Sequence, residues 1–134
     1  MKKILVHVHI FYENLYPELK ACLLNLNDYN CDYIFTFVKE NEALESDIKS
    51  TFKNVNVEIV KNLGFDLGPF VHVLNEVNLN DYSYVIKLHT KRDIPLNGKK
   101  DWYTGSGWRD ALLKFIRSKD VFDKVVERLE KNTN

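Results

Sequence analysis

Hydrophobic positions along the chain occur either in short runs or in stripes with helical spacing. Nearly continuous apolar runs are typical of strands buried on both faces of a parallel sheet, and strict alternation also indicates a strand. These patterns predict four strands, at residues 4–10, 33–38, 55–60 and 82–89. Between the strands, apolar residues recur at i, i+3, i+4 and i+7, or at i, i+4 and i+8, which is one face of a helix. The stripes predict three helices, at residues 17–26, 40–52 and 69–77.

The order of these elements indicates the fold class. Strands and helices alternate with short connections, as in a parallel sheet with helices packed on it. We therefore predict one α/β domain over residues 1–134, with a three-layer fold, a mainly parallel sheet and flanking helices. A long polar loop is predicted at 90–107, and loops of this length are usually functional or mobile. Two more helices, at 108–117 and 121–131, follow it, the second capped by Ser118.

The composition is that of a globular protein with its own core. Hydrophobic residues make up 45% of the chain and charged residues 28%. The apolar start is interrupted by His7 and His9, and no window approaches the roughly 20 apolar residues of a membrane span. We therefore expect a cytoplasmic protein. Cys22 falls on a helical apolar stripe, which predicts a buried free thiol, and neither it nor Cys31 has metal-ligand spacing.

Charge is balanced over the whole chain but unevenly distributed. The formal net charge of zero argues against a dedicated nucleic-acid binder. Residues 1–86 hold 7 Lys and Arg against 12 Asp and Glu, whereas residues 87–117 hold 8 against 3. This local basic excess favours a site for an anionic group, such as a ligand that carries phosphate.

Basic residues cluster where two of the predicted strands end. Ligands of open parallel sheets bind beyond the carboxyl ends of the strands. His7 and His9 lie on one face of the first strand, and the fourth strand leads into Lys87, His89, Lys91 and Arg92. The second group predicts a clamp for a diphosphate, because charged residues are costly in a buried strand unless they are paired or bound. Two alternatives stay open: a solvated strand end with His89 bonded to backbone, and purely structural roles for His7 and His9.

The loop after the third strand combines glycines with an acid. Asn62, Gly64, Asp66 and Gly68 lie in it, and Gly68 precedes Pro69 at a predicted helix start. Free N–H groups at that helix start would form an anion site. The alternative is an ordinary turn in which Asp66 caps the helix. We find no HExxH, Asp-x-Asp, Walker A, G-x-G-x-x-G or Gly-x-Ser-x-Gly pattern, so we expect no cofactor; a divalent metal stays open but has no support from an Asp-x-Asp motif.

Several of these segments together resemble the rhamnan synthesis protein F family. The specific parts are Gly-x-Asp-x-Gly-Pro-Phe from Gly64 and Lys-Leu-His-Thr-Lys from Lys87; His7-Val8-His9, Tyr16-Pro17-Glu18-Leu19, Asn62 and Trp108-Arg109-Asp110 add to them. The resemblance implies the Rossmann-like nucleotide-binding half of an A-type glycosyltransferase fold. It departs from the family at Phe65, where a polar residue is expected. Typical members are several times longer, which leaves open whether this chain is a fragment.

The resemblance also implies a function. It points to a glycosyltransferase domain that makes rhamnose-containing bacterial cell-wall or lipopolysaccharide chains. The donor would be a nucleotide-diphosphate sugar and the acceptor a polysaccharide or lipid-linked chain, with no nucleic acid involved. The domain would act in the cytoplasm, with peripheral association with the inner face of the membrane or with other transferases left open. A non-catalytic nucleotide-binding, sugar-binding or partner-binding module of the same ancestry is one alternative, and an unrelated phosphate-binding α/β domain is another.

Roles for individual residues follow from the resemblance. A-type enzymes usually hold a metal with Asp-x-Asp at the fourth strand, and here residues 87–91 would replace it with fixed cations. The predicted catalytic residues are Asp66 and Asp110; Asp110 is the first candidate for the acceptor base, ahead of Asp93. Its alternative role is to stabilise a helix N-terminus. The predicted substrate-binding residues are His7, His9, Asn62, Gly64, Asp66, Gly68, Lys87, His89, Lys91, Arg92, Trp108 and Arg109. Trp102, Tyr103 and Trp108 could stack on a sugar ring.

Overall fold

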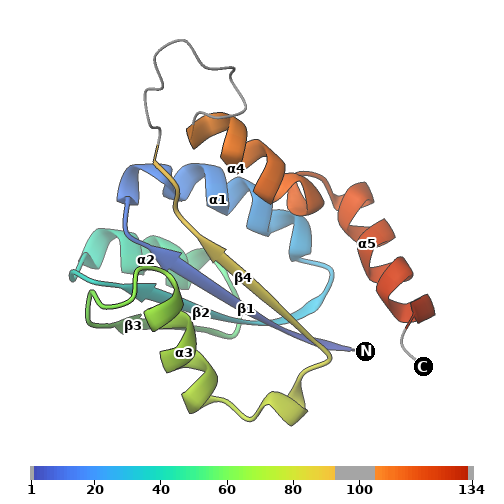
Figure 1. The fold of residues 1–134 in the computed structure, drawn as a ribbon, viewed down its shortest axis with the longest axis horizontal. Coiled ribbons are helices and arrows are strands. Elements are labelled where there is room, and N and C mark those ends of the chain that lie inside the picture. Colours follow the sequence, from blue (N-terminus) through green and yellow to red (C-terminus); the bar gives the residue numbers. More distant parts are fainter. Residues whose placement is uncertain (1, 93–104, 133–134) are drawn as a thin grey trace. The chain divides into compact units, whose positions relative to one another are not determined.

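A computed structural model of the chain describes residues 2–92 and 105–132. Its strands are β1 (Lys3–Ile10), β2 (Asn30–Phe37), β3 (Val55–Ile59) and β4 (Tyr84–His89). They form a four-stranded sheet in the order β3-β2-β1-β4, and each neighbouring pair is parallel (Figure 1). The predicted α/β class and parallel sheet are therefore confirmed.

The helices agree with the predicted stripes but differ at their ends. The longer ones are α1 (Tyr16–Leu23), α2 (Glu42–Thr51), α3 (Leu67–Glu76), α4 (Gly105–Leu113) and α5 (Lys119–Asn132). Short 3-10 turns are η1 (Glu13–Leu15), η2 (Leu24–Leu26), η3 (Leu79–Asp81) and η5 (Lys114–Ile116). The predicted helix at 17–26 therefore divides into α1 and η2. The predicted cap is confirmed, because Ser118 Oγ accepts a hydrogen bond from the N–H of Val121 at 3.2 Å.

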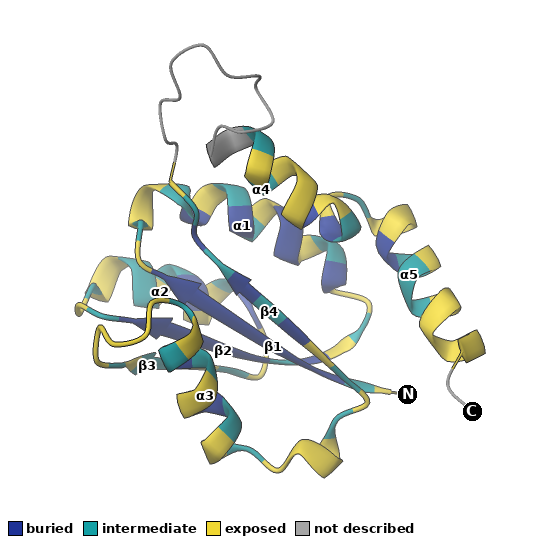
Figure 2. Ribbon diagram, viewed as in Figure 1, coloured by how far each residue is buried: buried dark blue, intermediate teal, exposed yellow. Residues whose placement is uncertain are grey.

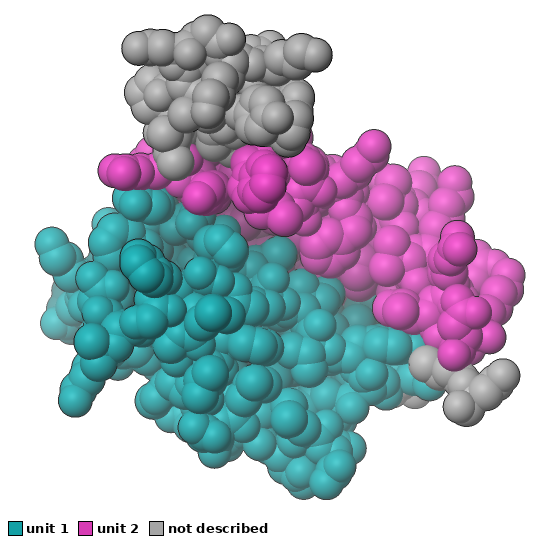
Figure 3. Space-filling view, in the orientation of Figure 1, with its two compact units in different colours: residues 1–13, 29–90 teal, residues 14–28, 91–134 magenta. Residues whose placement is uncertain are grey.

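The chain divides into two compact units (Figure 3). Unit 1 comprises residues 1–13 and 29–90, and it contains the whole sheet with α2 and α3. Unit 2 comprises residues 14–28 and 91–134, and it contains α1, α4 and α5. The segment 14–28 thus groups with the C-terminal helices, although it lies between β1 and β2 in sequence.

In unit 1, α2 and α3 cover opposite faces of the sheet. Phe52, which ends α2, packs its ring 5.4 Å from that of Phe35 on β2. Val73 of α3 packs with Ile34, the neighbouring residue of β2, and with Leu5 of β1. Successive strand residues point to opposite faces, so the two helices lie on opposite sides. Both central strands are almost wholly buried (Figure 2), as their near-continuous apolar runs predict.

The face that carries α3 becomes polar toward the carboxyl ends of the strands. Leu5 of β1 lies nearer the amino end of this face, Ile34 of β2 pairs with His7, and the register aligns further polar residues beyond Leu5. His7 pairs with Lys87 of β4, and His9 pairs with His89 of β4 and Thr36 of β2. Parallel strands end at one edge of the sheet, so these side chains gather at the edge where ligands of such sheets bind.

Unit 2 has its own buried apolar positions. They are Tyr16, Leu19, Cys22, Leu23, Leu26, Leu113, Ile116 and Phe122. η2 packs against α5, and the side-chain amide of Asn25 donates to the carbonyl of Ile116 at 2.8 Å. Cys22 is buried and carries a free thiol, as predicted. Within residues 2–92 and 105–132, no helix has the length and apolarity needed to cross a bilayer.

Candidate functional site

Three charged or titratable side chains meet beside the end of β4. Lys87 donates a hydrogen bond to the carboxylate of Asp66, which lies in the loop after β3. His89 Nδ1 lies 3.4 Å from Asp66 Oδ2 and 3.4 Å from Lys87 Nζ. The three side chains are 28%, 22% and 31% exposed for Asp66, Lys87 and His89. Solvent, and therefore a ligand, can reach each of them. The convergence of the loop that carries Asp66 with Lys87 and His89 at one edge was predicted, but the pairing of Asp66 with Lys87 was not.

The backbone of the loop at 62–68 explains how Asp66 reaches Lys87. Gly64 and Phe65 both have positive φ, at 71° and 54°. The carbonyl of Gly64 accepts hydrogen bonds from the N–H groups of Leu67 and Gly68, each at 3.0 Å. A Cβ on residue 68 would lie 1.8 Å from the carbonyl oxygen of Leu63, so only glycine fits there.

This geometry excludes the alternative role given to Asp66 and corrects one expectation about the loop. The side chain of Asp66 makes no capping hydrogen bond to α3, because its carboxylate pairs with Lys87. The N–H groups of Leu67 and Gly68 are not free for an anion, since Gly64 already accepts both. Gly64 and Gly68 therefore shape the loop. Asn62 lies exposed in the same loop.

A buried group of polar side chains lies behind this cluster. The Oγ1 of Thr36 is 2.8 Å from His7 Nε2 and 2.8 Å from His9 Nδ1. His7 and Thr36 are fully buried, and His9 is 3% exposed. The ring of His7 stacks on Phe70 of α3 at 5.7 Å, and Lys87 Nζ lies 5.9 Å from the same ring. His7 and His9 thus share a face, as predicted. Thr36 was not predicted as part of this group, because its position beside both histidines depends on the strand register.

Electrostatics set the charges of these groups. Burial, together with His9 and Lys87 nearby, lowers the pKa of His7 to about 3. Burial and the neighbouring His89 also lower the pKa of His9. Partial burial acts to raise the pKa of Asp66, but the hydrogen bond from Lys87 and the charge of His89 outweigh it and leave that pKa lowered. Near neutral pH the cluster therefore holds neutral His7 and His9 beside an anionic Asp66.

Thr90 connects the ends of β1 and β4. Its buried hydroxyl oxygen accepts hydrogen bonds from the N–H groups of Phe11 and Tyr12, at 3.1 and 3.0 Å. Its own N–H donates to the carbonyl of His9 at 3.1 Å. The residue therefore fixes the chain just beyond the two strands that carry the histidines. Sequence analysis placed Thr90 in a motif without giving it a role.

The remaining predicted site residues belong to unit 2. Arg109 donates to Glu18 Oε2 and to the carbonyl of Lys91, both at 2.7 Å. Arg117 donates to Glu18 Oε1 and to Asp110 Oδ1, also at 2.7 Å. Partial burial acts to raise the pKa of Glu18, but the hydrogen bonds from Arg117 and Arg109 leave it lowered. This network connects α1, α4 and the segment after β4.

Three of the unit 2 candidates are more exposed. The Asp110 side chain is 74% exposed, Trp108 is 44% exposed, and Arg92 is also exposed. The predictions for Asp93, Trp102 and Tyr103 fall outside the described residues.

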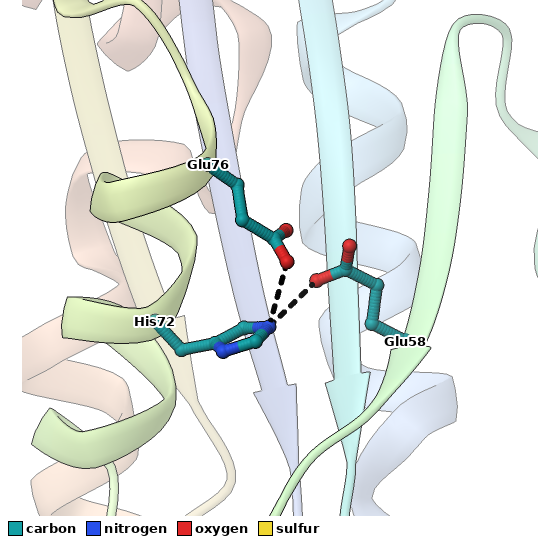
Figure 4. Close-up of side chains that lie close together, drawn as sticks. All are labelled: Glu58, His72 and Glu76. Atoms are coloured by element: carbon teal, nitrogen blue, oxygen red, sulfur yellow. Dashed lines mark ion pairs between the residues drawn. The ribbon is translucent and has the colours of Figure 1, made fainter.

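A second titratable cluster lies between α3 and β3 (Figure 4). His72 Nε2 is 2.9 Å from Glu76 Oε1 and 3.4 Å from Glu58 Oε2. One ligand atom from each residue lies within 4.8 Å of the others, so the group could hold a divalent cation. Burial and the nearby Glu76 raise the pKa of Glu58. The i,i+4 spacing of His72 and Glu76 was a signal in the sequence, but the contribution from β3 was not.

Comparison with protein families gives a match over the whole chain. Residues 1–134 match the family model described as Rhamnan synthesis protein F. Searches of curated proteins and of solved structures return no significant match. The full-length match agrees with the resemblance carried by the loop at 62–70 and the segment at 84–91.

Proposed function

Because the chain belongs to the rhamnan synthesis protein F family and has a role in rhamnan synthesis, we propose that it is a glycosyltransferase domain. Its ligand would be a nucleotide-diphosphate sugar, bound at the carboxyl edge of the unit 1 sheet. The observation that carries this proposal is the meeting of Lys87, His89 and Asp66 at that edge.

The chemistry of the three residues suits a diphosphate next to a sugar. Glycosyl transfer from such a donor leaves a diphosphate, whose developing charge must be stabilised. Lys87 and His89 can supply positive charge or hydrogen bonds there. A phosphate that takes the ammonium of Lys87 would release the carboxylate of Asp66, which could then accept a hydrogen bond from a sugar or ribose hydroxyl. The ion pair would thus be exchanged for two contacts to one ligand.

The acceptor side of the reaction needs a base for the attacking hydroxyl. Asp110 remains our candidate, because its carboxylate is 74% exposed and so can be reached by solvent. The acceptor would be a polysaccharide or a lipid-linked chain. Asp110→Asn should then abolish transfer while leaving donor binding unchanged.

Calorimetric titration with dTDP, UDP and GDP tests the donor site. Each nucleotide is added first with EDTA and then with manganese. Binding with EDTA present would support a site built from fixed cations and would identify the base of the donor. Binding that needs manganese would keep the nucleotide site but contradict the metal-independent mechanism. No binding under either condition would overturn the proposal.

A non-catalytic module that binds a nucleotide or sugar is the second candidate. Lys87 is already neutralised by Asp66 in the absence of ligand, which favours modest binding over strong stabilisation of a leaving group. Measurement of donor hydrolysis or sugar transfer separates the two. Binding without any turnover would favour the module.

A further inference from the structure

The hydroxyl of Thr36 lies between two buried histidines of β1. It is 2.8 Å from His7 Nε2 and 2.8 Å from His9 Nδ1. A hydroxyl has one hydrogen to donate, and a neutral imidazole has one N–H and one bare nitrogen. With both rings neutral, the hydroxyl cannot donate to both of them. If both rings donated to Thr36 Oγ1, neither of these two contacts would accept the hydroxyl hydrogen, so the arrangement that uses every donor has one ring donating to Thr36 and the other accepting from it. The two hydrogen bonds therefore run in one direction, from one histidine through Thr36 to the other.

The surroundings of His7 decide this direction. Its second nitrogen, Nδ1, is buried and has no hydrogen-bond partner among the described residues. If Thr36 donated to His7 Nε2, the proton of His7 would lie on Nδ1, as a buried N–H without an acceptor. Orphaned buried donors are rarer than orphaned acceptors. In the favoured arrangement, His7 Nε2–H donates to the Thr36 hydroxyl, and the Thr36 hydroxyl donates to His9 Nδ1.

The consequence for His9 is a fixed tautomer. Its Nδ1 accepts from Thr36, so its proton lies on Nε2, on the ring edge away from Thr36. His9 is paired in register with His89, which contacts Asp66 and Lys87. A neutral N–H at this position adds a hydrogen bond to an anionic ligand without a further charge to balance. His7 stacks on Phe70, and this contact holds the other end of the hydrogen-bonded series His7–Thr36–His9 in place.

We propose that Thr36 is a positioning residue of the carboxyl-edge site. By donating to His9 Nδ1 it places the proton of the neutral His9 ring on Nε2 and directs this N–H toward a phosphate oxygen of the ligand. The role in ligand binding rests on the proposed function, but the tautomer assignment does not. The two parts can therefore fail separately.

The first test is the tautomer itself, measured on the whole chain without ligand. Long-range proton–nitrogen NMR on chain with 15N-labelled histidine distinguishes the two tautomers. We expect a protonated Nε2 in both His7 and His9, and a slowly exchanging Thr36 hydroxyl proton that correlates with His9 Nδ1. A proton on Nδ1 of His9 in the unmodified chain would overturn the proposal.

The second test compares Thr36→Val with Thr36→Ser. Valine keeps the shape but removes the hydroxyl, whereas serine keeps the hydroxyl. We expect Thr36→Val to let His9 populate the Nδ1–H tautomer and to weaken binding of inorganic pyrophosphate by roughly fivefold, about the worth of one hydrogen bond. Thr36→Ser should restore both. If Thr36→Val leaves both readouts unchanged, Thr36 does not position His9.

The outcomes also separate this inference from the proposed function. If the unmodified chain shows the expected tautomers but binds neither pyrophosphate nor any nucleoside diphosphate, the ligand role and the proposed function are both overturned. The hydrogen-bond direction would then stand as a property of the fold. If pyrophosphate binds but Thr36→Val binds it equally well, the positioning role fails and the proposed site survives.

Discussion

Lys87 donates a hydrogen bond to Asp66, although Lys87 lies in β4 and Asp66 follows β3, and these two strands are at opposite edges of the sheet. β3 and β4 are separated by β2 and β1, and the loop after β3 turns back over the sheet to begin α3. Asp66 therefore approaches Lys87 from the face of the sheet that α3 covers. A basic residue at the end of β4 is in this way paired with an acid from the loop after β3.

Removal of the acid should free Lys87 for anions. We expect Asp66→Asn to tighten pyrophosphate binding by about threefold, because an ion pair that solvent can reach is worth up to about 1 kcal/mol. The same variant should weaken nucleotide-sugar binding if Asp66 also accepts from a ligand hydroxyl. Calorimetry with the two ligands measures both effects.

Asp81→Asn is the matched control for this comparison. It removes the same charge from η3, which precedes β4 and so lies toward the amino-terminal ends of the strands, away from the carboxyl-edge site. Equal effects from both variants would mean that net charge, and not the pairing with Lys87, governs anion binding.

Stability should fall with acid before the carboxylates titrate. Burial depresses the pKa of His7 to about 3 and also lowers the pKa of His9. The titratable groups that act on these two rings include His89, Lys87 and Asp66. The unfolded chain then binds protons below about pH 6.5 that the folded chain does not, so the stabilisation present above that pH is lost as the pH falls toward 3. Each such proton contributes a slope of about 1.4 kcal/mol per pH unit. Urea unfolding at several pH values between 7 and 4.5 measures this.

The pH prediction has its own control in a histidine variant. Replacing His7 by Phe removes one titrating group while keeping a ring to stack on Phe70. Whatever its absolute stability, this variant should show a shallower pH slope. An unchanged slope would show that His7 is not the group responsible.

In unit 2, Glu18 should contribute more to the free energy of unfolding than Asp110 does. Glu18 accepts from Arg109 and Arg117, and the Arg109 side chain is only 12% exposed. Glu18→Gln should lower the free energy of unfolding by about 1–3 kcal/mol, because it weakens hydrogen bonds to charged groups. Asp110→Asn, with a side chain 74% exposed, should change it by less than about 0.5 kcal/mol. Denaturant melts of the two variants, which change the same charge, make the comparison; equal losses would contradict it.

The stability of the fold should depend on the hydroxyl of Thr90 as a hydrogen-bond acceptor. Thr90→Val would leave the N–H groups of Phe11 and Tyr12 without the acceptor they now use, at a cost of about 1–3 kcal/mol for each one that stays buried. Thr90→Ser keeps the acceptor and should lose much less stability. Hydrogen exchange at these two amides gives a local readout, and unchanged protection in Thr90→Val would show that other groups replace the hydroxyl.

Part of the site could be predicted from strand periodicity alone. His7 and His9 lie two residues apart, as do Lys87 and His89, so each pair must share a face once its strand is recognised. The parallel arrangement then brings both pairs to the same edge. Thr36 carries no such signal, because its place between the histidines depends on how β2 is aligned with β1.

The sequence by itself determined the α/β class, the order of strands and helices, and the basic character of the end of β4. These follow from local periodicity and short connections, which act over a few residues. Only the tertiary structure decided that Asp66 neutralises Lys87, that Thr36 joins His7 to His9, and that residues 14–28 group with the C-terminal helices. Those relationships depend on strand register, on positive φ at Gly64 and Phe65, and on packing between distant segments. Such contacts leave no periodic pattern in the chain.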